Sequence, residues 1–290
     1  MKKVLVIGSN GMAGHIITLY LEQNIKLDIY NLSHSRKLND KSVMLDVTNF
    51  YKFEKLLNNL KPDYIVNCIG ILNRYAEIHK DMAILLNSYL PHFLEYKYKN
   101  TMTKIIHIST DCVFSGKDGN YHEDSFKDGD TFYARTKALG EIINEKDLTF
   151  RTSIIGPDLS EKGIGLFNWF MKSSGTINGY VNSIWTGVTT LELAKAIETV
   201  INKEDVTGVY HLVPEKNINK YDLLNILKFK FNRNDIIINR YENKPVKKNL
   251  IDMKKSFSYV VPEYDSMIDE MKEWINNHKY LYKHYYYRKT

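Results

Sequence analysis

The hydrophobic positions of this 290-residue chain alternate between short apolar runs and longer amphipathic stretches. The short runs, which predict buried strands, are Val4–Ile7, Asp28–Leu32, Tyr64–Asn67, Ile105–Ser109 and Leu148–Arg151. The stretches between them repeat apolar residues at spacings of three and four, which predicts helices over Ala13–Gln23, Phe50–Leu60, Met82–Lys99 and Phe132–Asn144. This alternation predicts an α/β fold with a doubly wound parallel sheet of the Rossmann type, covered by helices on both faces.

The regular alternation weakens after residue 155, where turns with glycine separate helical patterns over Leu191–Ile201, Tyr221–Phe231 and Met267–Asn277. We therefore predict a nucleotide-binding Rossmann domain over residues 1–155. Residues 156–278 are predicted to form a smaller α/β substrate-binding lobe, with some segments free to return to the Rossmann sheet. Residues 279–290 form a basic, tyrosine-rich tail.

Composition narrows the class of protein only in part. A hydrophobic content of 43% supplies a large core, and a net charge of +6 suits an anionic small molecule as well as nucleic acid. The two cysteines, Cys68 and Cys112, fit neither a metal site nor a redox pair, and no apolar run predicts a signal peptide or a membrane span. We expect a cytoplasmic protein with no membrane partner and no metal.

The tail interleaves tyrosines with lysines and arginine, a composition found where single-stranded nucleic acid stacks on a protein. The alternative is a packed or frayed terminus, which we favour. We therefore expect no nucleic-acid partner.

A glycine-rich turn, Gly8-Ser9-Asn10-Gly11-Met12-Ala13-Gly14, directly follows the first strand and opens the first helix. Glycine permits unusual backbone torsions and lets a pyrophosphate approach the free N–H groups of the helix N-terminus. The spacing is G-x-x-G-x-x-G instead of the G-x-G-x-x-G of many dehydrogenases. We predict that Gly8, Asn10, Gly11, Met12 and Gly14 contact a dinucleotide.

The end of the second strand lacks the acidic residue that usually binds the ribose 2′-hydroxyl of NAD. Ser33, Ser35, Arg36 and Lys37 occur there, and hydroxyls with a guanidinium suit a 2′-phosphate. We predict NADP (NADPH), with Ser33, Ser35 and Arg36 as contacts. The alternative is that Arg36 and Lys37 are solvated loop charges.

The residues that could carry chemistry are Ser109-Thr110-Asp111 at a strand end, and Tyr133 and Lys137 on one face of a helix. A nearby ammonium lowers the pKa of a phenol, so Tyr133 could exchange a proton with a carbonyl or alcohol oxygen. A hydroxyl of Thr110 or Ser109 would hold that oxygen while hydride moves. We predict that one of these two hydroxyls forms a single catalytic site with Tyr133 and Lys137.

These residues resemble the extended short-chain dehydrogenase/reductase superfamily and, within it, the dTDP-4-dehydrorhamnose reductase family. The most specific stretch, from Ser109 to Gly116, is similar to the family pattern S-T-D-x-V-F-x-G, and Tyr133 to Glu141 and Arg151-Thr152-Ser153 follow it. The resemblance implies NADPH-dependent reduction of the C4 keto group of a nucleotide-linked 4-keto-6-deoxy-hexose. It leaves open whether the nucleotide is dTDP or UDP, and whether the protein is a homodimer.

The resemblance makes Thr110, Tyr133 and Lys137 the catalytic trio, with Tyr133 as the acid, and it also implies further roles. Asp46 and Val47 would contact the adenine, Cys68, Ile69 and Gly70 would line the cofactor, and Asn87 would lie behind Lys137. On the substrate side it implies Asp111, Val113 and Trp185, although a core anchor is an equal interpretation of Trp185. Asn168, Trp169 and Lys172 would line the mouth or form a solvated helix face.

Two departures leave the sugar open. Ile154-Ile155-Gly156 replaces an aromatic residue common in the rhamnose enzymes. The segment from Gly179 to Val188 is instead similar to relatives that reduce UDP-linked N-acetylated 4-keto-6-deoxy-hexoses.

Three rival functions share the fold. A 4,6-dehydratase usually places Asp-Glu after the active-site threonine, and Asp111-Cys112 disfavours it, because a thiol cannot readily replace that carboxylate. A sugar-nucleotide 4-epimerase and a non-catalytic NADP-binding regulatory subunit stay open.

Overall fold

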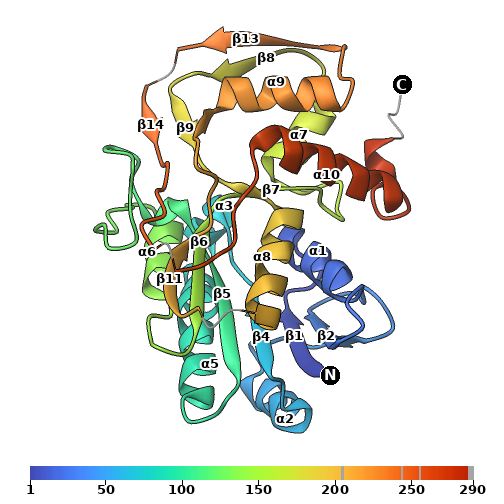
Figure 1. The fold of residues 1–290 in the computed structure, drawn as a ribbon, viewed down its shortest axis with the longest axis vertical. Coiled ribbons are helices and arrows are strands. Elements are labelled where there is room, and N and C mark those ends of the chain that lie inside the picture. The colour runs from blue at the N-terminus through green and yellow to red at the C-terminus, as the bar shows by residue number, and fades with distance from the viewer. Residues whose placement is uncertain (204–205, 243, 255, 287–290) are drawn as a thin grey trace.

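A seven-stranded parallel sheet forms the lower half of the molecule in the computed structural model, which describes residues 1–203, 206–242, 244–254 and 256–286 (Figure 1). The strand order is β11-β6-β5-β4-β1-β2-β3. The strands are β1 (Lys2–Ile7), β2 (Leu27–Ser33), β3 (Ser42–Met44), β4 (Tyr64–Asn67), β5 (Lys104–Thr110), β6 (Leu148–Thr152) and β11 (Gly208–His211). The predicted doubly wound fold is confirmed.

Helices cover both faces of this sheet because successive side chains of a strand point to opposite sides. Val4 and Val6 of β1 pack with α1 (Met12–Leu21) and α8 (Thr190–Lys203) on one face. Leu5 and Ile7 of the same strand pack with α2 (Phe50–Leu60) and α5 (Leu90–Tyr98) on the other. The core therefore has two layers, one on each face of the sheet.

One predicted helix is broken into pieces, and another is shorter than predicted. The Met82–Lys99 pattern comprises the end of α4 (Lys80–Ala83), a π-helical turn η1 (Ile84–Tyr89) and α5, preceded by α3 (Asn73–Ile78). Helix α6 (Phe132–Leu139) ends before Gly140, so the predicted extension to Asn144 is wrong. A Cβ on Gly140 would lie 1.8 Å from the Asn87 carbonyl oxygen in η1, which shows how closely the two backbones approach.

The hydrophobic pattern did not predict the two edge strands of the sheet. β3 has only three residues, too few for a periodicity, and β11 comes from the C-terminal half and pairs with β6. The C-terminal half thus contributes a strand to the Rossmann sheet and, through α8, a helix to its covering layer.

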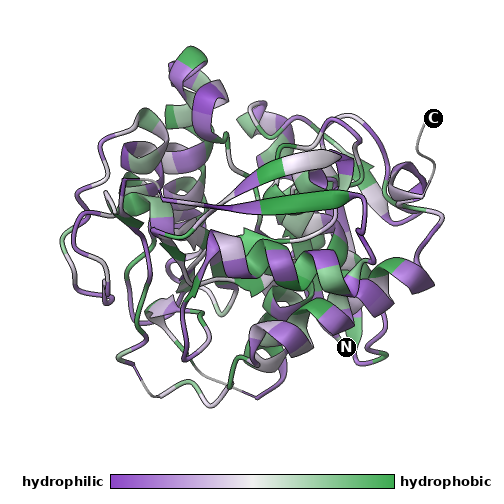
Figure 2. Cartoon of the chain, turned by 90° about the horizontal axis from the view of Figure 1, so that it is seen from above, coloured by the Kyte–Doolittle hydropathy of each residue, from purple (hydrophilic) through white to green (hydrophobic). Residues whose placement is uncertain are grey.

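Within the described residues, the upper lobe contains three small sheets and three α-helices (Figure 1). Its sheets pair β7 (Ile154–Ile155) with β10 (Val188–Thr189), and β8 (Gly175–Tyr180) with β13 (Ile236–Tyr241), and place β9 (Ser183–Trp185) between β12 (Ile218–Asn219) and β14 (Val246–Lys247). The helices are α7 (Leu166–Lys172), α9 (Lys220–Lys230) and α10 (Tyr264–Asn277). Hydrophilic and hydrophobic residues alternate along the helices (Figure 2), and α10 buries Met267, Met271 and Trp274 at helical spacing.

The tyrosine-rich segment is packed where the structure describes it. Tyr282 is fully buried, Tyr285 is 8% exposed, and a 3-10 turn, η3 (Lys283–Tyr285), ends this segment. The phenol of Tyr285 accepts a hydrogen bond from the Asp158 N–H at 2.9 Å. These contacts fit the packed-terminus interpretation, while residues 287–290 lie outside the described residues. No helix in the described part of the chain is long and apolar enough to cross a membrane.

Candidate active site

The glycine-rich turn between β1 and α1 has the geometry that a pyrophosphate site needs. Gly8 has a φ of +86°, and a Cβ on Gly14 would lie 2.2 Å from the Gly8 carbonyl oxygen. Gly11 is the N-cap of α1, with no side-chain capping bond and no acidic residue in the first turn. The first-turn N–H groups of α1 are therefore open to an anion, and this turn fits a dinucleotide cofactor.

The loop after β2 is held against this turn by two predicted cofactor contacts. The Ser33 hydroxyl and the Asn10 amide both donate hydrogen bonds to the Arg36 carbonyl oxygen. Ser33 is buried, whereas the side chains of Ser35 and Arg36 are exposed. Ser33 and Asn10 thus shape the loop, and Ser35 and Arg36 are the groups that it presents.

The remaining predicted cofactor residues follow β3 and β4. The carboxylate of Asp46 accepts hydrogen bonds from the Thr48 N–H at 2.9 Å and hydroxyl at 2.7 Å, which lower its pKa, and Val47 is buried beside it. Cys68, Ile69 and Gly70 continue from β4, which pairs with β1. The side chain of Ile69 lies 3.0 Å from the position of a Cβ on Gly8, so the two loops are adjacent.

The predicted trio comes together where β5 meets α6. Thr110 is the last residue of β5, and Tyr133 and Lys137 lie on α6, which begins after the Thr131 hydroxyl accepts a hydrogen bond from the Ala134 N–H. All three side chains are nearly buried, with exposed fractions of 9%, 7% and 3%.

The pKa of Tyr133 differs from the sequence-based expectation, whereas Lys137 keeps the charge that was expected of it. Burial raises the pKa of Tyr133, and a hydrogen bond with Thr110 opposes this only in part, so the predicted lowering of the Tyr133 pKa is wrong. Burial lowers the pKa of Lys137 to about 8. The Lys137 ammonium donates to the Ile108 carbonyl oxygen at 2.7 Å and lies 3.3 Å from Nε2 of His107. At neutral pH the phenol is therefore protonated and the amine is mostly charged.

Ser109 and Asn87 support the trio from behind. The Ser109 hydroxyl donates to the Glu141 carboxylate at 2.7 Å, which leaves Thr110 as the hydroxyl beside Tyr133. The Asn87 amide donates to the Thr136 hydroxyl at 3.0 Å and to the Ile71 carbonyl oxygen at 2.9 Å. Asn87 thus joins α6, at the residue before Lys137, to the loop after β4.

The predicted substrate residues occupy different environments. Asp111 is buried, which raises its pKa, and its carboxylate accepts a hydrogen bond from Thr110 at 3.1 Å. Val113 is fully buried in a cluster with Phe114 and Tyr121, and so supports this loop from below. Trp185 is 4% exposed and packs on Tyr264 with ring centroids 5.7 Å apart.

The three residues named at the mouth do not form one surface. The Asn168 amide is buried and donates to the Gly163 carbonyl oxygen at 2.5 Å. Trp169 is 44% exposed, and Lys172 is exposed as well. Asn168 therefore has a structural contact inside the lobe, and the other two lie on the solvated face.

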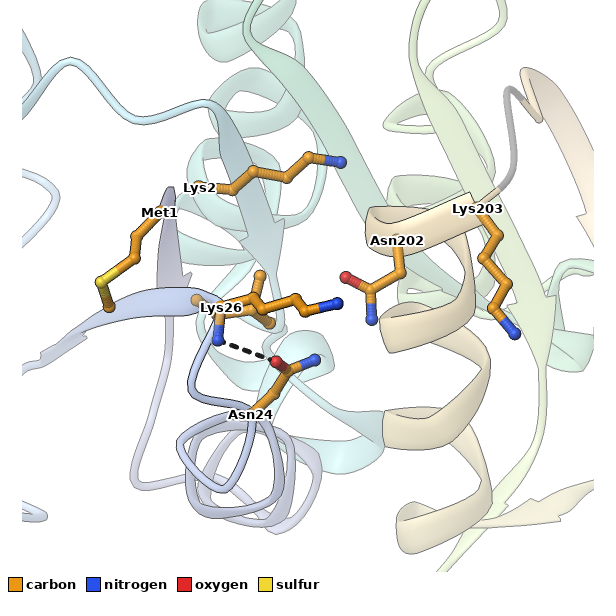
Figure 3. A pocket seen from close by; sticks show the side chains of 7 residues that line it. Met1, Lys2, Asn24, Lys26, Asn202 and Lys203 are labelled. Carbon is orange, nitrogen blue, oxygen red and sulfur yellow. Dashed lines mark hydrogen bonds between the residues drawn. The ribbon is translucent and has the colours of Figure 1, made fainter.

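A hollow elsewhere on the molecule is not part of this site. Met1, Lys2, Asn24, Lys26, Leu27, Asn202 and Lys203 line it (Figure 3). Lys2 begins β1 and Leu27 begins β2, so the hollow lies at the amino ends of the strands. The glycine-rich turn and the trio lie at the opposite, carboxyl edge of the sheet, where open α/β folds bind ligands.

Comparison with known proteins decides the family. The family described as "RmlD substrate binding domain" matches residues 1–248. The chain belongs to the RmlD substrate-binding domain family. It is thereby related to the dTDP-4-dehydrorhamnose reductases, a family of oxidoreductases.

Curated relatives of this RmlD family member have different names. The spore coat polysaccharide biosynthesis protein SpsK of Bacillus subtilis is 27% identical over 221 residues, 73% of each chain. The dTDP-4-dehydrorhamnose reductase of Salmonella typhimurium is 29% identical over 179 residues, 58% of this chain and 60% of the relative. The methionine adenosyltransferase 2 subunit beta of Xenopus tropicalis is 23% identical over 235 residues, 77% of this chain and 70% of the relative.

A solved structure agrees on the fold. The dTDP-4-dehydrorhamnose reductase of Bacillus anthracis, crystallised with NADP, is 19% identical and superposes with a TM-score of 0.77 over 94% of this chain and all of that one. At this identity the likeness concerns the fold alone.

The sequence of this RmlD family member did not predict that two lysines lie near the site. Lys220 at the start of α9 and Lys248 after β14 both act electrostatically on Asp111. Neither belongs to a local motif, and their proximity to Asp111 arises only when the lobe packs on the Rossmann sheet.

Proposed function

We propose that this protein catalyses the NADPH-dependent reduction of the C4 keto group of a nucleotide-linked 4-keto-6-deoxy-hexose. The observation that carries the proposal is the position of Tyr133, a buried phenol beside Thr110 and four residues before Lys137 on α6. This phenol is protonated at neutral pH, and a nearby ammonium can stabilise the phenolate that forms when it gives its proton to the substrate, as a reduction requires.

Each member of the trio has its own role in the reduction. NADPH, when bound, supplies the hydride. The Thr110 hydroxyl turns its proton from Asp111 to the carbonyl oxygen, and Tyr133 gives its own proton to that oxygen as negative charge develops there, so the product is an alcohol. The charge of Lys137, fixed by the Ile108 carbonyl oxygen, stabilises the phenolate that Tyr133 becomes.

For the cofactor, we assign the pyrophosphate to Gly8, Gly11 and Gly14, with Asn10 and Met12 in the same turn. We assign the adenine to Asp46 and Val47, and the loop of Cys68, Ile69 and Gly70 to the nicotinamide half. The absence of an acid at the end of β2 and the exposed Ser35 and Arg36 favour the 2′-phosphate of NADP. Asn87 positions α6, and thereby Lys137.

For the substrate, a dTDP-linked sugar agrees with the names of two relatives, and the family resemblance also allows a UDP-linked sugar. We assign Asp111 to the bound sugar because it is hydrogen-bonded to Thr110, and Val113 acts through the backbone that it supports. Trp185 contributes through the Lys220 ammonium, which lies over its ring.

The test is NADPH oxidation with dTDP- and UDP-linked 4-keto-6-deoxy-sugars. We expect oxidation with one of them. Tyr133→Phe should lower kcat by about 10²–10⁴-fold, because it removes the proton donor. Its NADPH affinity should stay within about twofold of the wild type. Tyr96→Phe, on an exposed part of α5, is the matched control and should have wild-type activity.

The same assay separates the two rivals. A 4-epimerase would interconvert two sugars with no net NADPH consumption. A non-catalytic regulatory subunit would bind NADPH and leave each sugar unchanged; the Xenopus relative is itself named as a subunit of another enzyme. Either result, or a Tyr133→Phe variant with full activity, would contradict the proposal.

A further inference from the structure

Two cations from the lobe converge on the end of β5. Lys220 follows β12, and Lys248 follows β14, and both strands pair with β9 from opposite sides. The charges of both lysines act on Asp111, the residue next to Thr110. The small sheet around β9 thus directs two positive charges toward the predicted reaction site.

Among the described residues, the Lys220 ammonium packs against an aromatic ring and not against a hydrogen-bond acceptor or an anion. Its ammonium lies 4.4 Å from the centroid of the Trp185 ring. In the described part of the chain, no hydrogen bond or ion pair within 4 Å reaches this ammonium. Burial lowers its pKa to about 8, with Asp111 and Cys112 acting in the other direction. A cation that loses water without a close anion is costly, so this position needs an explanation.

Asp111 does not compensate both lysines. It carries one carboxylate, its pKa is raised by burial, and it already accepts a hydrogen bond from Thr110. Lys248 adds a second charge beside the same loop, where a Cβ on Gly116 would lie 2.9 Å from its Cγ. The site therefore has an excess of positive charge, which an anionic ligand would balance.

We propose that Lys220 and Lys248 bind the diphosphate of the nucleotide-sugar substrate. This inference rests on the proposed function. In such a substrate the diphosphate lies across the hexose ring from C4, so when Thr110 and Tyr133 hold the C4 oxygen, the diphosphate lies about one ring away. The charges of Lys220 and Lys248 both reach Asp111, the neighbour of Thr110, and Lys is a common ligand of phosphate. Trp185 then acts indirectly, as the platform of Lys220.

The experiment measures binding of UDP, dTDP, uridine and thymidine to the NADPH-loaded protein by calorimetry. Lys220→Gln and Lys248→Gln should each weaken the nucleoside diphosphate that binds the wild type by tenfold or more. Binding of the matching nucleoside and of NADPH should stay within about twofold. Lys220→Arg should retain most of the diphosphate affinity, since it keeps the charge.

Lys228→Gln is the matched control, because this lysine lies on the same helix α9 in its last turn. It should bind UDP and dTDP as the wild type does. Unchanged diphosphate affinity in both Lys220→Gln and Lys248→Gln would overturn the inference. So would an equal loss for nucleoside and diphosphate, which indicates a general structural defect, or a wild type that binds neither UDP nor dTDP.

The outcomes also separate this inference from the proposed function. If no keto-sugar is reduced but Lys220→Gln loses UDP or dTDP affinity, the proposed function fails and the diphosphate site stands. If reduction occurs and both variants bind the diphosphate normally, the proposed function stands and the diphosphate site fails.

Discussion

The ammonium of the buried Lys137 donates a hydrogen bond to a backbone carbonyl oxygen, that of Ile108, and not to a carboxylate. The charge of Glu141 raises its pKa, but burial is the larger effect and lowers the pKa to about 8. Burial also keeps the neighbouring His107 neutral, because it lowers the pKa of that imidazole well below its usual value. Near neutral pH, Lys137 is therefore the charged group of the trio.

This charge predicts how kcat depends on pH. Lys137 is protonated below about pH 8 and neutral above it, so kcat at saturating sugar should be level from pH 6 to 7 and should fall through about pH 8. Lys220 has a similarly lowered pKa, but its effect belongs to substrate binding and should appear in KM. A kcat that stays constant to pH 9.5 would contradict the role of Lys137.

At this scale the sequence predicts which residues act better than it predicts their state. The spacing of Tyr133 and Lys137 and the strand end at Thr110 are local features, and the structure brings these residues together. Ser109 and Thr110 were equivalent in the sequence, because only Glu141, a distant residue, separates their roles. The raised pKa of Tyr133 depends on burial, which the sequence does not show.

An ion pair joins the end of α6 to β6. Arg151 donates to Glu141 through Nε at 2.9 Å and Nη2 at 2.8 Å, and the two side chains are 1% and 0% exposed. Burial alone would raise the pKa of Glu141, but the hydrogen bonds and charge of Arg151 outweigh it and lower the pKa. Ser109 of β5 donates to the same carboxylate, so the pair fixes three elements around the trio.

Removing one partner of this pair should be costly. Glu141→Gln leaves the Arg151 charge buried and unpaired, which should lower the free energy of unfolding by about 3–5 kcal/mol. Urea unfolding at pH 7 measures the change. Glu263→Gln, which breaks an ion pair whose partners are both 74% exposed, should leave the unfolding midpoint unchanged. Equal midpoints for both variants would show that the buried pair contributes nothing.

At the scale of elements the sequence predicts the strands of the sheet centre and the long helices. It misplaces the end of α6, because Gly140 and Glu141 leave the helix for contacts with Asn87 and Arg151. β11 was missed because it joins the sheet through a distant strand, β6.

The C-terminal segment connects the lobe directly to α1, the helix that follows the cofactor turn. Nδ1 of His15, on α1, is 2.8 Å from the Gly11 carbonyl oxygen, and Nε2 is 2.8 Å from the Tyr282 hydroxyl. Burial lowers the pKa of His15 to about 4, so the ring is neutral. Since a carbonyl only accepts, we assign the proton to Nδ1, and Nε2 accepts from Tyr282. The indole of Trp274 donates to the same hydroxyl at 3.2 Å.

Tyr282→Phe tests this connection. It leaves the buried groups of His15 and Trp274 without their partner, so the free energy of unfolding should fall by about 1–3 kcal/mol. Thermal or urea unfolding measures the loss. Tyr280→Phe is the control, because Tyr280 is 64% exposed and should be neutral. A Tyr282→Phe variant as stable as the wild type would show that the segment is not anchored by these bonds.

The central claim is that hydride is delivered to C4 of a nucleotide-linked keto-sugar while Tyr133 supplies the proton. The most direct measurement uses NADPH deuterated at the transferable position of the nicotinamide, with the dTDP- or UDP-linked 4-keto-6-deoxy-sugar that is consumed, and NMR of the product. The account predicts one deuterium, at C4, with stoichiometric loss of NADPH. A product without deuterium at C4, or no product despite bound NADPH, would contradict it.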